Sequence, residues 1–341
     1  MTRRSWLLMG LLAALWGASY MFIKIALHDD VPAPSIVFIR VTLGAALLTA
    51  IAAHQHALTG LRGRWRWVWA IGVVQVAGPF LLITYGEKWI PSALAGILVA
   101  SAPIFVALLS PRFAASEAVH GWAVVGIAVG ILGVMLLFGV DLSGSAKLAL
   151  GGGMVLLAGL GYAFGAIWVR WKMPGAPPVA IAAGTMITAA IVTLPLAATH
   201  LPPHAISLGA SAALLALGAG GTGIAFLIYY VLIADVGANR ASVVAYLAPG
   251  FSVVYGALFL SEPITVATIG GLALILAGSW IAAEGRAPWQ RRTTVPAARS
   301  AAAEVAMEPL AEDLVGERVP DMSAARSARG RSSARGPARA R

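Results

Sequence analysis

The chain is a succession of long apolar runs separated by short polar connections. A helix that crosses the hydrocarbon core of a membrane needs about 20 mainly apolar residues. Ten runs meet this requirement, at residues 5–27, 33–53, 67–86, 92–111, 119–140, 148–169, 178–199, 208–233, 239–260 and 264–283. They lack the strict alternation of a membrane β-strand, and backbone groups in lipid must be satisfied internally. We therefore predict an all-α integral membrane protein with ten transmembrane helices.

The composition supports this class and narrows the chemistry. Of the 341 residues, 59 % are hydrophobic and 11 % charged, whereas soluble proteins have about 25 % charged residues. The net charge of +10 does not indicate nucleic-acid binding, because 11 of the 24 Lys and Arg residues follow position 284. The absence of cysteine excludes disulfides and thiolate metal sites.

Positive charge predicts the orientation of the spans. Short cytoplasmic loops are enriched in Lys and Arg. With a cytoplasmic N-terminus, nine such residues before the tail fall on the cytoplasmic side and two on the other. The nine are Arg3, Arg4, Arg62, Arg64, Arg66, Arg112, Arg170, Lys172 and Arg240, and the two are Lys88 and Lys147. We predict a multi-pass protein of the cell (inner) membrane with both termini in the cytoplasm.

The chain also repeats itself at an offset of 145 residues. The matched pairs are Gly78 and Gly223, Tyr85 and Tyr230, Glu117 and Glu262, Gly126 and Gly271, and Gly133 and Gly278. Each copy contains five spans, an odd number, so the second copy inserts upside down relative to the first. Inverted repeats of this kind are the architecture of many secondary transporters. We predict two repeats at 5–140 and 148–283, followed by a disordered basic cytoplasmic tail at 284–341.

Short motifs occur in a consistent order within the two repeats. They are Trp16-Gly17-Ala18-Ser19-Tyr20 followed by Lys24, Arg40 after Pro34, Ser101-Ala102-Pro103-Ile104-Phe105, Tyr246-Leu247-Ala248-Pro249, and Leu260-Ser261-Glu262-Pro263. Together they resemble the EamA family of the drug/metabolite transporter superfamily. The resemblance covers about residues 5–283. It implies a central substrate cavity between the halves, alternating access, peripheral fifth and tenth helices, and export of metabolites or drugs.

Lys24 and Arg40 are the most informative candidate site residues. Both lie within predicted spans, in the half nearer the outer face. An intramembrane cation is costly and marks a functional site by default. Facing inward, the two side chains would attract a substrate carboxylate or phosphate. Two alternatives stay open, because Lys24 is close enough to the span end to snorkel and either cation can pair with a backbone carbonyl.

Other polar and aromatic side chains in the spans are candidates for lining the cavity or for joining helices. The full set is Trp16, Ser19, Tyr20, Gln75, Ser101, Tyr162, Thr222, Tyr230, Asn239, Ser242 and Tyr246. Prolines within spans remove a backbone hydrogen bond and kink the helix. Pro79, Pro103 and Pro249 are therefore candidates for kinking and gating. The glycines of the fifth and tenth spans predict close helix packing.

The acidic residues give little support for coupling to protons. Glu87, Glu117, Glu262 and the other candidate acids lie in predicted loops or at span edges, so we expect no buried carboxylate relay. We expect Glu117 and Glu262 to cap the helices that follow them. No metal, cofactor or ATPase motif is predicted, and we expect a transporter and not an enzyme. The alternatives are a membrane enzyme acting on lipid-linked substrates and a non-transporting scaffold. We expect a small-molecule substrate and the lipid bilayer as partners, and the sequence leaves a homodimer open.

Overall fold

The structure, a computed structural model, describes residues 2–113, 121–140 and 144–284, and all regular structure in these ranges is helical. In the first half the helices are α1 (Arg3–His28), α2 (Ala33–His54), η1 (Ala57–Leu61), α3 (Trp65–Ile71), η2 (Gly72–Ala77), α4 (Gly78–Gly86), α5 (Ser92–Val99), α6 (Ala102–Leu109), η3 (Ser110–Arg112) and α7 (Trp122–Val140). In the second they are α8 (Ala146–Lys172), α9 (Pro178–Thr199), α10 (Leu208–Leu215), η5 (Ala216–Ile224), α11 (Ala225–Val236), α12 (Ala238–Ala241), α13 (Val244–Leu260) and α14 (Val266–Glu284).

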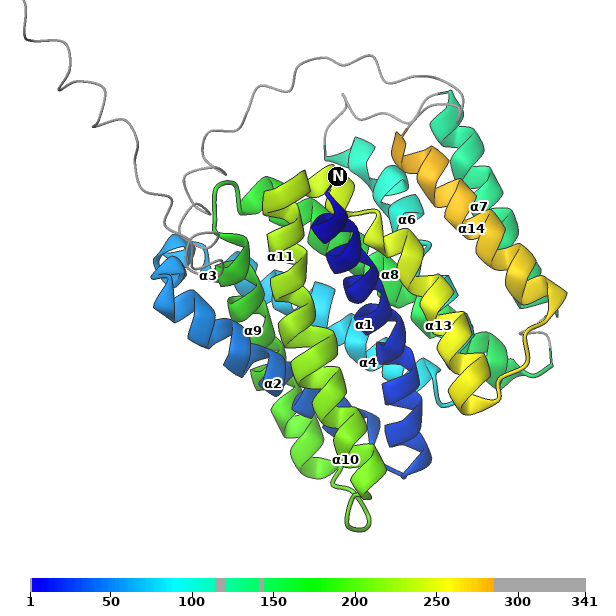
Figure 1. Cartoon of the computed structure of the whole chain (residues 1–341), viewed down its shortest axis with the longest axis horizontal. Helices are drawn as coiled ribbons and strands as arrows, with labels where there is room; N and C mark the ends of the chain where they lie inside the picture. Colours follow the sequence, from blue (N-terminus) through cyan, green and yellow to red (C-terminus); the bar gives the residue numbers. More distant parts are fainter. Residues whose placement is uncertain (1, 114–120, 141–143, 285–341) are drawn as a thin grey trace, which may run out of the picture. The chain divides into compact units, whose positions relative to one another are not determined.

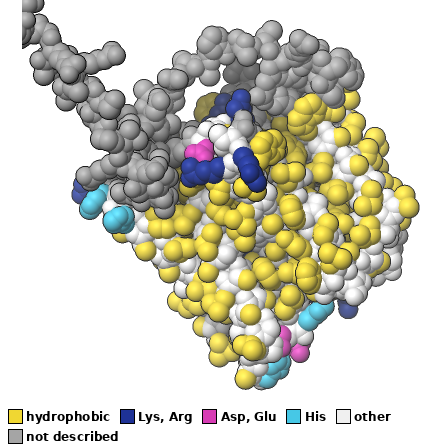
Figure 2. Space-filling model, viewed as in Figure 1, with side chains coloured by type: hydrophobic (Ala, Val, Ile, Leu, Met, Phe, Trp, Pro, Cys, Tyr) yellow, Lys and Arg dark blue, Asp and Glu magenta, His cyan; other side chains and the backbone are white. Residues whose placement is uncertain are grey.

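These helices confirm the prediction of a ten-helix membrane protein. Within the described ranges, nine helical stretches are at least 18 residues long and apolar enough to cross a membrane, and Val244–Leu260 is a shorter apolar helix. Figure 2 shows apolar side chains covering the middle of one face, while charged and histidine side chains gather toward two opposite ends. The predicted tail beyond Glu284 and the predicted cap Glu117 lie outside the described residues.

Two spans contain a π-helical segment at equivalent places in the repeats. The third span is interrupted by η2 and the eighth by η5, which covers the residues equivalent to η2 at the 145-residue offset. Pro79 follows η2 and has no N–H to donate to the carbonyl of Gln75, so the α-helical register is lost there. In η5, by contrast, the Oγ1 of Thr222 donates to the carbonyl of Leu217, five residues earlier, at 3.1 Å. π-Helical turns are frequent at functional sites.

The other two candidate prolines differ from the prediction. Pro103 lies in the first turn of α6, where a missing N–H is harmless, and the break in the fourth span is at Ala100 and Ser101, just before it. Pro249 lies inside α13, which continues through it. The ninth span is instead interrupted before α13, between α12 and Val244. A kink therefore does not follow from each proline by position alone.

Contacts between the halves follow a mirrored pattern. α1 packs against α13, α10 and α11, and its repeat counterpart α8 packs against α5, α6, η2 and α4. α2 packs against α9, and α7 against α14, so each of these pairs joins a helix to its own counterpart. Figure 1 shows α7 and α14 side by side at one edge of the bundle, away from α2 and α9. This pattern is what a two-fold axis between inverted repeats produces.

The α7–α14 pair meets along a seam of glycines. A Cβ atom added to Gly126 would lie 2.8 Å from the carbonyl oxygen of Gly278, and one added to Gly278 would lie 2.6 Å from that of Gly126. Gly133 is similarly close to Leu274. Small residues allow helix backbones to approach closely in lipid, where the hydrophobic effect does not hold helices together. The prediction of close packing by these glycines is confirmed for this seam.

Loops of the two halves are tied together at both ends of the bundle. At one end, the Asp29 carboxylate accepts a hydrogen bond from the backbone N–H of Ser207 at 2.9 Å, and the Ser35 hydroxyl donates to the carbonyl of His200 at 2.6 Å. At the other end, Nη1 of Arg64 donates to the carbonyl of Pro174 at 2.7 Å. The loops joined by the first set are the repeat equivalents of the loops joined by the second set. We call them the Asp29 latch and the Arg64 latch.

The Asp29 latch is expected to open in acid. The hydrogen bond from the Ser207 N–H holds the pKa of Asp29 below its usual value. The stabilisation that the ionised Asp29 gives to the latch is therefore present at neutral pH and is lost as pH falls through that lowered pKa. The test is the distance between spin labels at His28→Cys and Ala205→Cys, on a chain that has no other cysteine. We expect the distance to increase below about pH 4. In an Asp29→Asn background it should already be long at neutral pH, whereas Asp235→Asn, which alters an exposed acid of α11 outside the latch, should behave like the parent. An unchanged distance in Asp29→Asn would contradict the latch.

Candidate functional site

Arg40 lies in the interior, where the two halves meet. Its side chain is 8 % exposed. Nε donates to Oγ1 of Thr222 at 3.0 Å, and Cζ lies 3.7 Å from the centroid of the Phe80 ring, a cation–π arrangement. Thr222 belongs to η5 of the second repeat, and Phe80 follows η2 of the first. Arg40 therefore connects α2 to both interrupted spans.

Lys24 is directed into the bundle and bound by backbone carbonyls. Its Nζ donates to the carbonyl oxygens of Glu87 at 2.5 Å and Ile90 at 2.9 Å. These residues follow the C-terminus of α4, where helical carbonyls lack partners and the helix dipole attracts a cation. Of the alternatives that the sequence left open, the structure therefore favours the carbonyl contact over snorkelling.

Glu87 is buried, although the sequence predicted an acid at a span edge and no buried carboxylate relay. Its side chain is 0 % exposed, although it lies just beyond the span Trp65–Gly86. The expectation failed because hydropathy places an acid after an apolar run at the membrane edge, whereas here the α1–α2 connection and Lys24 cover it. Burial raises the pKa of the Glu87 carboxyl well above its usual range, and the neighbouring Lys24 ammonium acts in the opposite direction.

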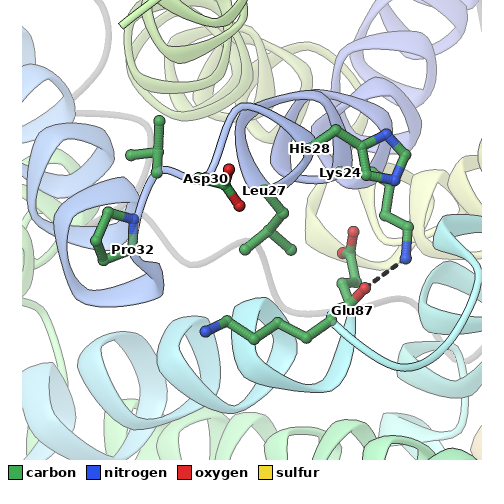
Figure 3. A pocket seen from close by; sticks show the side chains of 8 residues that line it. Lys24, Leu27, His28, Asp30, Pro32 and Glu87 are labelled. Carbon is green, nitrogen blue, oxygen red and sulfur yellow. Dashed lines mark hydrogen bonds between the residues drawn. The ribbon is translucent and has the colours of Figure 1, made fainter. Parts of the chain in front are cut away.

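A pocket of about 340 Å³ adjoins Lys24 and Glu87 at this end of the bundle. Figure 3 shows Lys24, Leu27 and His28 of α1 on one side of it, Asp30 and Pro32 in the connection to α2, and Glu87 opposite. The pocket therefore combines both signs of charge with apolar side chains. Such a mixed lining suits a small solute that has a polar head and an apolar body.

Two tyrosines join the pocket residues to Arg40. Tyr20 of α1 lies near Glu87, Arg40 and Tyr162, and Tyr162 of α8 lies near Arg40. Both rings are partly buried and pack against the core. The structure thus brings together a set that we call the polar cluster: Tyr20, Lys24, Arg40, Glu87, Tyr162 and Thr222.

Two further candidates belong to an aromatic group beside α1. The Trp16 ring centroid lies 5.4 Å from that of Tyr229 and 6.2 Å from that of Phe226. The Tyr230 ring lies 6.1 Å from Phe226. This group comes from α1 and α11, so it also spans the two repeats. It offers an apolar wall and hydroxyl groups at one interface.

The remaining candidates lie in other parts of the bundle or have contacts within their own segments. The hydroxyls of Ser19 and Ser101 donate within their own segments, to the carbonyls of Leu15 at 3.1 Å and Leu98 at 2.6 Å. Gln75 fills the space beside Gly165 of α8. Ser242 is exposed and Tyr246 is partly buried on α13, while the side chain of Asn239 lies outside the described part of the chain.

Glu262 also corrects an expectation, because it caps a distant helix and not the helix that follows it. Its carboxylate accepts hydrogen bonds from the backbone N–H groups of Ser92 at 2.6 Å and Ala93 at 2.9 Å. These are the first residues of α5 in the other repeat. Ser261, with φ of +54°, ends α13 in the left-handed conformation and turns the chain toward α5.

Sequence reasoning missed Glu87, Phe80 and Glu262 as interior partners. One available signal was depth, because Lys24 and Glu87 both lie near the outer ends of predicted spans and carry opposite charges. No comparable signal singled out Phe80 among the apolar residues. In the described residues, no group of three or more His, Cys, Asp or Glu side chains is placed to bind a metal ion.

Comparison with known proteins places both repeats in one family. The model of the EamA-like transporter family matches residues 4–139 and 149–283. An uncharacterized transporter of Archaeoglobus fulgidus is 27 % identical over 83 % of this chain and 100 % of its own. The uncharacterized inner membrane transporter YedA of Escherichia coli K12 is 29 % identical, over 76 % of this chain and 83 % of its own.

Two other similarities concern one relative's name and the fold. A probable amino-acid metabolite efflux pump of Salmonella typhimurium is 28 % identical over 82 % of this chain and 95 % of its own. One crystal structure, 22 % identical, superposes with a TM-score of 0.61 over 83 % of this chain and 98 % of that chain. Because this identity is low, the similarity to the crystal structure supports the fold alone.

Proposed function

Because the chain belongs to the EamA-like transporter family, we propose that it is a secondary transporter that exports small metabolites, amino-acid-like compounds or drugs by alternating access. Membership makes it a multi-pass membrane transporter with a small-molecule substrate. The direction, the substrate class and the cycle are our proposal. Export agrees with the name of the Salmonella relative.

The observation on which this proposal depends is the position of Arg40. A buried guanidinium is costly, so it is retained where it has a partner or a ligand. Its Nε has Thr222 as a partner and its face is covered by Phe80. A carboxylate or phosphate entering between the halves would gain a charge-assisted, bidentate contact with the guanidinium. The candidate site therefore favours substrates that have an anionic group.

Alternating access is supported by the two latches. The Asp29 latch and the Arg64 latch are repeat equivalents of each other, and they lie at opposite ends of the bundle. Rocking of one repeat against the other would break one set of contacts at a time, because the mirrored helix pairs pivot about the same interface. The interrupted spans lie at this interface, where η2 packs against α8 and α9 and η5 packs against α1 and α2.

Transport by purified protein in liposomes tests the proposal. A panel of amino acids, nucleobase-like metabolites and cationic drugs is loaded under several gradients, with Arg40→Ala, Arg40→Lys and wild type side by side. For an anionic solute we expect Arg40→Ala to lower the rate about 30- to 150-fold, the equivalent of a lost charged hydrogen bond of about 2–3 kcal/mol. Arg40→Lys should retain part of the rate.

Arg62→Ala is the matched control, because Arg62 is exposed in a connection between spans. It should transport at the wild-type rate. Insertion and folding of each variant are checked by size-exclusion chromatography and by the protease accessibility of the loops. If nothing on the panel moves under any gradient, the membrane-enzyme and scaffold alternatives replace the transporter. If Arg40→Ala transports normally, the site lies elsewhere.

A further inference from the structure

Glu87 has the one carboxylate in the described residues whose two oxygens are both buried and without a hydrogen-bond partner. An ionised carboxylate in such surroundings is strongly disfavoured, because burial removes water and nothing replaces it. Two states avoid the free-energy cost of an unpaired buried charge: a protonated carboxyl, or a carboxylate that binds a cation. The residue lines the pocket, so either a proton or a ligand cation can reach it when the pocket opens.

The charged groups around Glu87 are engaged by other partners. Nζ of Lys24 donates to backbone carbonyls. Nε of Arg40 donates to Thr222. The Glu262 carboxylate accepts from the N-terminus of α5. Tyr20 also lies near Glu87, and His28, Asp30 and Lys88 complete the charged and titratable lining of the pocket.

Burial outweighs the neighbouring charges and favours the protonated form of Glu87. Lys24 and Arg40 favour an ionised Glu87, while Glu262 and burial favour the protonated form. Lys24 already binds the backbone carbonyl oxygens of Glu87 and Ile90. A second positive group would therefore approach the Glu87 carboxylate from the pocket side (Figure 3). The ammonium of an amine fits this position, because it provides N–H donors for two unpaired carboxylate oxygens.

We propose that Glu87 couples transport to protons by binding either a proton or the ammonium group of a cationic or zwitterionic substrate, one excluding the other. This inference depends on the proposed transporter function. In the exchange, the O–H bond of the carboxyl breaks and its proton goes to water as the ammonium binds. On the other side the ammonium leaves and a proton from water forms the O–H bond again. No electrons are transferred and one positive charge replaces another.

The first test is a direct titration that does not require transport. Infrared spectra of purified wild type are recorded between about pH 5 and about pH 9, and differences are taken between them. We expect the C=O band of a protonated carboxyl, and we expect this band to be still present at neutral pH. The band should be absent from Glu87→Gln, an isosteric change that imitates the protonated form. It should persist in Asp235→Asn, which alters an exposed carboxylate on α11, outside the pocket. A band identical in wild type and Glu87→Gln would overturn the proposal.

The second test measures competition between a proton and an amine. Phenethylamine and L-phenylalanine are the probes, with 3-phenylpropionate as the probe that lacks an ammonium. In weakly buffered detergent solution, binding of either amine should release about one proton per site from wild type and from Asp235→Asn, as expected for one carboxyl that is protonated near neutral pH, and none from Glu87→Gln. Binding without proton release from wild type would overturn the proposal.

The third test separates this inference from the proposed function. In liposomes, a gradient of about one pH unit should change amine accumulation about tenfold, because one unit corresponds to about 1.4 kcal/mol. Glu87→Gln should lose this dependence while Glu87→Asp retains part of it. If a solute of the wider panel is transported but the flux of amines ignores the gradient in wild type, the transporter stands and the role of Glu87 falls.

Discussion

Replacing Gly278 with alanine is expected to destabilise the protein by about 3 kcal/mol, at the upper end of the range for overpacking. The new Cβ would lie within contact of the Gly130 backbone nitrogen and 2.6 Å from the carbonyl oxygen of Gly126. These are backbone atoms, so the overlap is relieved only by separating α7 from α14. Separation removes the close contacts that hold two helices together in lipid.

Gly139→Ala is the matched control, because it lies on α7 with no atom within 4 Å of the added Cβ. Alanine is about 1 kcal/mol better than glycine in a helix interior. Gly139 is next to the last residue of α7, so the gain is smaller there, and this variant should be as stable as wild type or slightly more so. The measurement is thermal unfolding of the purified variants in detergent, followed by tryptophan fluorescence. Equal midpoints for Gly278→Ala and Gly139→Ala would show that the seam is not closely packed in solution.

Replacing Glu262 with alanine is expected to cost about 2–3 kcal/mol, typical of hydrogen bonds to a charged group. The carboxylate is bound to two backbone N–H groups at the N-terminus of α5, and also lies 3.1 Å from the Ser92 hydroxyl. Ser92 is 1 % and Ala93 4 % exposed, so water does not replace the lost acceptor. The negative charge is also favourable at this end of the helix dipole.

Hydrogen exchange gives the most specific readout for this cap. In Glu262→Ala, the first-turn amides of α5 should exchange faster, while those of α9 should keep their protection. Glu262→Gln should be intermediate, because its amide oxygen still accepts one hydrogen bond. Asp235→Ala removes an exposed acid from α11 and should leave both helices unchanged. Uniform loss of protection across the bundle would indicate general destabilisation and not loss of a cap.

The number and limits of the spans could be predicted from the sequence because length and apolarity are local properties. The second span was placed at 33–53 and the helix is Ala33–His54, and the seventh, 178–199, coincides with Pro178–Thr199. The interruptions were not predicted in kind. η2 is followed by a proline, whereas η5 has no proline and contains several glycines and the Thr222 hydroxyl. The same π-helical interruption therefore has two different local causes.

The partners within the site could not be predicted, because they depend on how helices pack. Arg40 was singled out by its charge inside a span, but its contact with Thr222 joins residues 182 positions apart. Glu262 was assigned to the neighbouring helix, and its partner Ser92 lies 170 positions away. Glu87 was placed at an edge, because hydropathy describes one span and not the connection that covers it.

The seam between α7 and α14 also has a consequence for biosynthesis. α7 ends at Val140 and its partner begins at Val266, so the nascent chain must insert four further spans before the pair can form. During that interval the glycine face of α7 borders lipid or the insertion machinery, and the first repeat is an incomplete folding unit. A ribosome stalled before Val266 should therefore hold a chain with an unpaired fifth helix, one that membrane quality-control proteases recognise and degrade.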